Sequence, residues 1–184
     1  DFCLSRGLGD VYKRQIIHFL FILLPIAAMS QETKVQLTEK VSISFPEKPD
    51  VRNMQDVATI YSLKLADSTA NFNVIVQNLG KNGLTEEQIE SAQLEPAFWE
   101  QLEASFVAQL GNESKVLSKE KKNISGKDIL ILELITERNG KKMEVKSYIF
   151  IESVHSINIV HSKRAAGASV DLKDKFFNSL KIVE

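Results

Sequence analysis

The sequence predicts an α+β fold, with a mostly antiparallel sheet of six or seven strands flanked by helices. Two observations favour this class. Short runs in which apolar and polar residues alternate recur along the chain, and this period is typical of half-buried strands. The pair Asn139-Gly140 lies between two such runs and is typical of a two-residue hairpin turn, in which both residues need positive φ. Hairpins join antiparallel neighbours, so most of the sheet should be antiparallel.

Three strands are expected before the first long helix. Residues 41–45 alternate apolar and polar, and Pro46 ends the run because proline has no N–H to donate to a ladder. The next two strands are expected over residues 58–65 and 71–79, and residues 80–83 are expected to form a loop.

Two helical segments follow. Thr85 and Gln88 have the spacing of a capping box, so a helix should begin at Thr85. Pro96 is suited to the first turn of a second helix, which should end near Gly111. Every fourth residue of this second helix is apolar, which indicates a helix that covers a sheet: Phe98, Leu102, Phe106 and Leu110.

Four more strands and a last helix complete the expected order. The strands are expected over residues 115–122, 129–135, 143–151 and 156–161. The second of them is nearly continuously apolar, as in a strand covered on both faces. Asp171 is expected to cap the C-terminal helix, whose inward residues should be Leu172, Phe176, Phe177 and Leu180.

Four sequence stretches carry a resemblance to a known superfamily. They are VSISFPEKP, ISGKDILILEL, SYIFIESVHSINIVHS and DLKDKFFNSLKI. Together with the order of elements, they resemble the PsbP/Mog1-like superfamily over about residues 35–183. The resemblance implies an antiparallel sheet flanked by helices, as in many small secreted bacterial proteins of unassigned role. The better-known members resemble binding or assembly-support proteins without a shared catalytic residue set, so no functional residue is transferred.

The N-terminal region has the sequence features of a leader. Residues 3–15 resemble a translated sequencing adapter, and the alternative is a genuine disordered extension, so no element of the fold is assigned to residues 1–15. Residues 16–30 have the order of a signal peptide, because an apolar run of about 14 residues, too short to span a bilayer, precedes Ala28 and Ser30 at the −3 and −1 positions. Residues 31–184 should then form a single secreted or periplasmic domain without a stable membrane span.

Composition excludes several classes of partner. The chain has 23 Lys plus Arg and 24 Asp plus Glu, a net charge of −1, which gives no electrostatic reason to expect nucleic acid or an anionic membrane. Its one cysteine excludes a disulfide framework and a cysteine-rich zinc site. There is no P-loop or dinucleotide fingerprint, so no cofactor is expected.

Candidates for chemistry are few. His155 and His161 stand six residues apart on one expected strand, roughly 20 Å, too far to share a metal ion. Glu133 interrupts an apolar strand, where it could act as an acid or base or pair with a cation. There is no G-x-S-x-G elbow, although a Ser/His/Asp site assembled across the fold stays open. We assign neither catalytic nor metal-binding residues.

The functional prediction is an exported, non-catalytic binding or assembly-support module of the bacterial envelope, whose partner is a protein or an apolar small molecule. The alternative is a small secreted hydrolase with a site assembled from dispersed Ser, His, Asp and Glu residues. Phe98, Leu102, Phe106 and Trp99 are the candidate binding residues. The first three should be buried in the centre of the apolar stripe, whereas Trp99, about 100° from Phe98 around the axis, should lie at its margin and meet a ligand. The alternative for all four is core packing.

Overall fold

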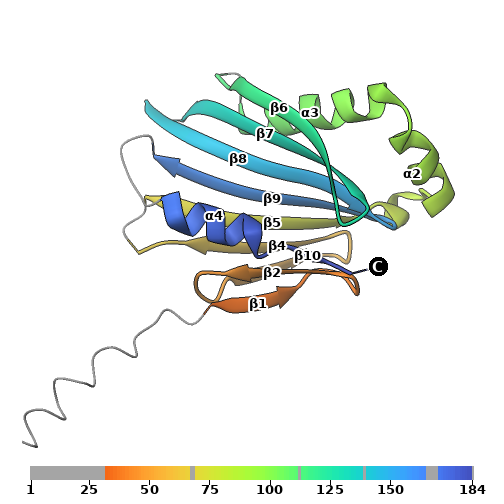
Figure 1. The fold of residues 1–184 in the computed structure, drawn as a ribbon, viewed down its shortest axis with the longest axis horizontal. Coiled ribbons are helices and arrows are strands. Elements are labelled where there is room, and N and C mark those ends of the chain that lie inside the picture. Colours follow the sequence, from red (N-terminus) through yellow and green to blue (C-terminus); the bar gives the residue numbers. More distant parts are fainter. Residues whose placement is uncertain (1–31, 67–68, 112, 139, 165–169, 184) are drawn as a thin grey trace, which may run out of the picture. The chain divides into compact units, whose positions relative to one another are not determined.

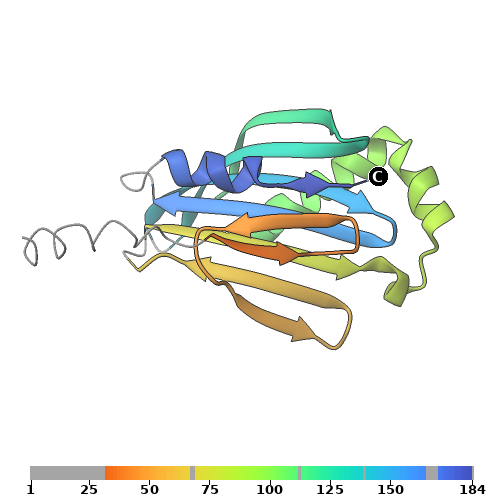
Figure 2. The same cartoon turned by 60° about the horizontal axis from the view of Figure 1, so that its bottom comes forward.

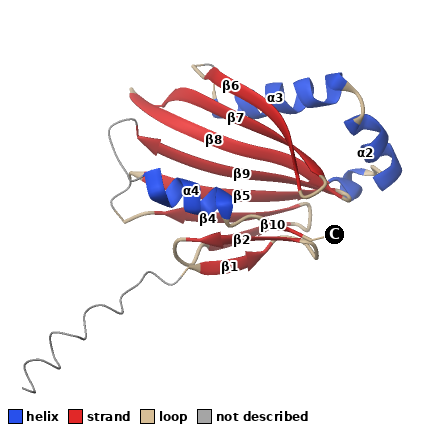
Figure 3. Cartoon of the chain, in the orientation of Figure 1, coloured by secondary structure: helices blue, strands red, loops and turns tan. Residues whose placement is uncertain are grey.

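The computed structural model describes residues 32–66, 69–111, 113–138, 140–164 and 170–183. The expected signal peptide and its cleavage point lie outside the described residues. The α+β class is confirmed (Figure 1; Figure 3), since the chain forms strands and helices in the following order. They are β1 (Thr33–Gln36), β2 (Val41–Phe45), β3 (Asp50–Met54), β4 (Ala58–Lys64), β5 (Ala70–Asn78), η2 (Leu79–Asn82), α2 (Glu86–Gln93), α3 (Pro96–Leu110), β6 (Lys115–Ile124), β7 (Lys127–Arg138), β8 (Lys141–Glu152), β9 (His155–Arg164), α4 (Val170–Asn178) and β10 (Lys181–Ile182).

The main sheet has seven strands in the order β3-β4-β5-β9-β8-β7-β6, and every neighbouring pair is antiparallel. The expected hairpin between β7 and β8 is confirmed, because Ile135 pairs with Glu144 and the strands close at the turn that contains Gly140, with φ +70°. Asn139 lies outside the described residues. The pairing of β5 with β9 brings the first and second halves of the chain together in the middle of the sheet.

A second, three-stranded sheet has the order β1-β2-β10. Residues 41–45 form the expected strand, but it is the centre of this small sheet and not part of the main one. Ser42 is therefore also buried, at 5% exposure, because β1 and β10 flank it on both sides. The expectation missed β3 as the outer strand of the main sheet.

Two local predictions need correction and two are confirmed. Residues 80–83 are not an open loop, because the 3-10 helix η2 covers most of them and ends at Gly83, with φ +84°. Helix α4 already begins at Val170, before the expected cap at Asp171. The capping box of α2 is present, with the Thr85 hydroxyl accepting from the Gln88 N–H and the Gln88 side chain accepting from the Thr85 N–H. Pro96 starts α3 as expected.

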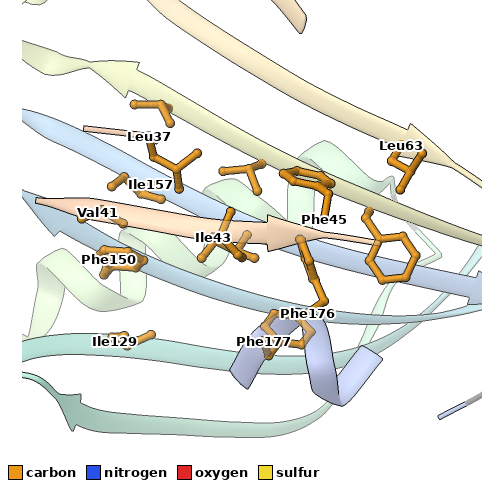
Figure 4. Packing of buried hydrophobic residues seen from close by; sticks show 14 of the residues in the cluster. Leu37, Val41, Ile43, Phe45, Leu63, Ile129, Phe150, Ile157, Phe176 and Phe177 are labelled. Carbon is orange, nitrogen blue, oxygen red and sulfur yellow. The ribbon is translucent and has the colours of Figure 1, made fainter. Parts of the chain in front are cut away.

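The larger core lies between the main sheet and the layer formed by α4 and the small sheet (Figure 2; Figure 4). Phe176 of α4 stands at its centre, with ring centroids 5.2 Å from Phe45 of β2 and 5.0 Å from Phe72 of β5. Phe177 is buried beside it, so the inward face expected for this helix is confirmed. These aromatic contacts hold α4 and the small sheet against one face of the main sheet.

The smaller core lies on the opposite face, beneath α3. Leu130, Leu132 and Leu134 of β7 face this helix, while Ile129 and Ile131 of the same strand belong to the larger core. β7 is therefore covered on both faces, which explains its nearly continuous apolar sequence. None of the helices within the described ranges is long and apolar enough to cross a membrane.

Candidate functional site

A groove opens beside α3, where the helix leaves part of the sheet uncovered. Helix α3 packs on side chains from β7 and β8, with Val160 from β9, so the neighbouring surface of β5, β9 and β8 forms the floor of an open groove. The volume of this groove is about 320 Å³. We call it the helix–sheet groove.

One face of α3 forms the wall of the helix–sheet groove. Phe98, Leu102, Ser105 and Gln109 line it and recur with helical spacing, so they lie along one stripe. The first two are apolar and the last two are polar, so the wall changes from apolar to uncharged polar along the helix. Phe106 lines the base of the groove, where the helix meets the sheet.

Two rows of paired residues form the floor. Asn158 of β9 lies between Ile75 of β5 and Ile149 of β8, and all three side chains are on the face toward α3. In the next row, Ser156 lies between Gln77 and Ile151 in the same way. The central strand therefore supplies polar groups to a floor that is otherwise partly apolar.

The groove lining carries hydrogen-bonding groups but no charge. Within the described part of the chain, no Asp, Glu, Lys or Arg lines it. The Asn158 Oδ1 accepts a hydrogen bond from the buried Ser147 hydroxyl at 2.7 Å, which fixes the amide and leaves its NH₂ group as a donor. The groove can therefore bind an apolar group and hydrogen-bond a neutral polar one, but it offers no counter-charge to an ion.

The structure corrects the burial expected along α3. Trp99 is only 6% exposed, and its indole N–H donates to the Gln93 carbonyl oxygen at 2.8 Å. Lys121 of β6 lies over its ring, 5.1 Å from the centroid. With its N–H satisfied and its ring covered, the indole can be buried in the core. Phe98 and Leu102, which were expected to be buried, are partly exposed and line the groove, whereas Phe106 is buried as expected.

The candidates for chemistry are not brought together. His155 is the first residue of β9 and His161 is the seventh. His161 is 2% exposed, and its ring centroid lies 4.9 Å from that of Phe72 at a tilt of 57°, in the larger core and away from the groove. Burial, followed by the charges of nearby lysines, lowers the pKa of His161 to about 4. In the described ranges, neither imidazole hydrogen-bonds to a serine, aspartate or glutamate side chain.

Glu133 pairs with a cation, which is the second of the two roles that the sequence left open for it. Its Oε1 lies 3.1 Å from the Nζ of Lys146 on the neighbouring strand, and the glutamate side chain is 45% exposed. Among the described residues, no group of three or more His, Cys, Asp or Glu side chains could hold a metal ion.

Most of the wall of the groove consists of residues predicted from the sequence, whereas its floor does not. Three of the four candidate binding residues line it, and Trp99 lies behind them with its ring edge-on to Phe98 at 5.5 Å. Ser105 and Gln109 continue the stripe of Phe98 and Leu102 at helical spacing, and this spacing could have identified them as wall residues from the sequence.

No protein-family model and no curated protein matches the chain. Several solved structures are similar to it. A protein from Bacteroides thetaiotaomicron is 10% identical, and the match covers 85% of this chain and 49% of that protein, with a TM-score of 0.43. The chain thus spans about half the length of the Bacteroides protein.

Two further similar structures are matched over nearly their whole lengths. Cyanobacterial PsbP from Synechocystis is 12% identical, and the match covers 85% of this chain and 95% of that one, with a TM-score of 0.48. LpqN from Mycobacterium tuberculosis, described as involved in cell envelope biogenesis, is also 12% identical, with 84% and 91% covered and a TM-score of 0.40.

Proposed function

We propose that the chain is an exported, non-catalytic binding module of the bacterial envelope, and that its helix–sheet groove binds an uncharged amphiphile. The observation that carries this proposal is the lining of the groove, which is apolar with neutral hydrogen-bonding groups and has no charged side chain in the described part of the chain. An acyl chain with an ester, amide or hydroxyl head group fits this chemistry.

The dimensions and charge of the groove narrow the ligand further. A volume of about 320 Å³ is at the lower end of the range for small-molecule sites, so a short acyl chain fits better than a long one. An ionised carboxylate would lose its hydration without gaining a cation, and this desolvation disfavours free fatty acids. The Asn158 NH₂ group and the Gln77 side chain can hydrogen-bond a neutral head group.

The first test compares two ligands that differ in charge. We expect monodecanoylglycerol to bind the purified chain at least about tenfold more tightly than decanoate at neutral pH, because only decanoate carries a charge. Titration calorimetry measures both affinities, and the fluorescence of Trp99, which lies beside Phe98, reports occupancy. Tighter binding of decanoate, or no binding of either ligand, would contradict the assignment, and the second outcome would favour a protein partner.

A matched pair of variants locates the site. Ser105→Phe adds a ring to the wall of the groove and should abolish binding of monodecanoylglycerol. Ala104→Phe adds the same ring to the neighbouring exposed position, which does not line the groove, and should leave binding within about twofold of wild type. Equal binding by the two variants would place the ligand elsewhere.

Export is tested separately. When the chain is expressed in a bacterium behind an added start codon, we expect a periplasmic or secreted product whose first residue is Gln31. Intact-mass measurement of the purified product identifies its first residue. A product that keeps residues 16–30 and stays in the cytoplasm would contradict export without affecting the binding test.

A further inference from the structure

The two edges of the main sheet differ in how they are protected. β6, at one edge, carries Lys119, Lys121 and Lys122, and its pairing with β7 shifts register between Val116 and Ser118. Charged residues and bulges are the usual means by which an edge strand resists pairing with another chain. β3, at the other edge, is extended over five residues, and no register shift interrupts its pairing with β4 (Figure 2).

β3 is also exposed along its whole length. All five of its residues are exposed, and Val51 is an apolar side chain at 53% exposure. Asp50 and Arg52 lie on the opposite face of the strand from Val51, and neither forms an ion pair with any other residue that the structure describes. This strand therefore presents unpaired backbone groups, two opposite charges and two apolar side chains, those of Val51 and of Met54, which is 55% exposed.

Pairing of β3 with the same strand of a second copy is restricted by geometry. Along an edge strand, every second residue points its N–H and C=O groups out of the sheet, and directly opposite residues of an antiparallel pair must both do so or both not. A two-fold axis that relates two identical strands must therefore lie between the two copies of one residue, which we call an axis through that residue. Axes through Val51, Arg52 or Asn53 each pair at least three residues of the strand. An axis through Asp50 or Met54 pairs only one residue of the strand, because β3 begins at Asp50 and Gln55 leaves the extended conformation with positive φ.

Charge selects one of these three axes. An axis through Val51 places Asp50 opposite Arg52 of the second copy twice and packs the two Val51 side chains against each other. An axis through Arg52 places two arginines directly opposite, which is unfavourable. An axis through Asn53 places Arg52 opposite Met54, where it gains no ion pair.

We propose that the partner of β3 is β3 of a second copy, paired antiparallel about a two-fold axis through Val51. The interface is isologous, and through it the main sheet of one copy continues into the main sheet of the other. Because this axis is perpendicular to the sheet, the helix–sheet grooves of the two copies open on the same side of the dimer. The ladder is short, so the dimer should be weak and should dissociate on dilution.

A charge-reversal series tests the ion pairs. In sedimentation experiments from about 10 μM to about 1 mM, we expect wild type to shift from monomer to dimer. Asp50→Arg alone and Arg52→Asp alone each create like-charge pairs and should weaken dimerisation at least about tenfold. The double variant Asp50→Arg/Arg52→Asp restores opposite charges and should recover wild-type dimerisation, and a mixture of the two single variants should form heterodimers.

Cysteine cross-linking tests the register. In a Cys3→Ser background, Val51→Cys should give a disulfide-linked dimer under mild oxidation, because the axis places this residue opposite itself. Asn53→Cys, on the same face of the same strand and also next to Arg52, should not, because the axis does not place this residue opposite itself. A wild-type chain that stays monomeric up to about 1 mM, single reversals without effect, or faster linkage at Asn53 would each overturn the proposal.

Discussion

Replacement of Phe176 by alanine is expected to lower the free energy of unfolding by about 3–5 kcal/mol. The ring is 1% exposed and contacts the rings of Phe45, Phe72 and Phe177 at centroid distances of 5.2, 5.0 and 5.5 Å. Its removal leaves a cavity where α4, the small sheet and the main sheet meet. Because the surrounding rings come from three separate elements, the cavity cannot be filled by a small movement of one of them.

The control for this prediction is Phe98→Ala. Phe98 is partly exposed at the wall of the helix–sheet groove, so its removal should cost only about 1 kcal/mol. Urea denaturation of wild type and both variants measures the difference. A loss from Phe176→Ala no larger than that from Phe98→Ala would contradict the central role of this ring in the core.

Elements whose determinants are local could be predicted from the sequence. The β7–β8 hairpin depends on a two-residue turn and on apolar runs beside it, and these signals lie within one short stretch. The capping box of α2 and the start of α3 at Pro96 are likewise fixed by residues a few positions apart. Their physical causes are contained in the segments themselves.

The assignment of strands to sheets could not be predicted in the same way. Alternation in residues 41–45 indicates a strand with a buried face, but it carries no information about the neighbouring strand. β2 is drawn into the small sheet because Val41 pairs with Ile182 near the C-terminus and Phe45 packs on Phe176. β3 was missed because both of its faces are exposed, so its sequence lacks the alternation that marks a half-buried strand.

The same distinction applies to the candidate site. The wall of the groove lies on one helix, so its residues follow from helical spacing. The floor exists only because β5 pairs with β9, which places Ile75 beside Asn158 although they are far apart in sequence. Trp99 was predicted to lie at the margin of the apolar stripe. Its burial depends on a hydrogen bond from its indole N–H to the Gln93 carbonyl oxygen, and the hydropathy of the helix carries no information about this bond.

The unfolding free energy is also expected to depend on pH through His161. Burial, followed by the charges of Lys173 and Lys163, lowers the pKa of His161 to about 4. The imidazole ring lies against the ring of Phe72, and Lys146 of β8 is the neighbour of His161 in the strand register. The carboxylates of Asp174 and Glu144 raise the pKa of His161, but by less than burial and the lysines lower it.

The sign of this effect follows from proton binding. The unfolded chain binds the proton at its ordinary pKa near 6.5, whereas the folded chain binds it only near pH 4. Between these values the unfolded state holds more protons, so the free energy of unfolding is at its full value above about pH 6.5 and falls as the pH is lowered. The His161 contribution to this loss should approach about 3 kcal/mol at pH 4 and stop growing below it.

A variant separates this contribution from the titration of carboxylates. His161→Gln removes the titrating ring, so the difference between the wild-type and variant unfolding free energies should change between pH 6.5 and 4 by the amount assigned to this residue. Urea denaturation at several pH values measures both chains. Parallel profiles for wild type and His161→Gln across this window would show that the buried imidazole does not oppose folding in acid.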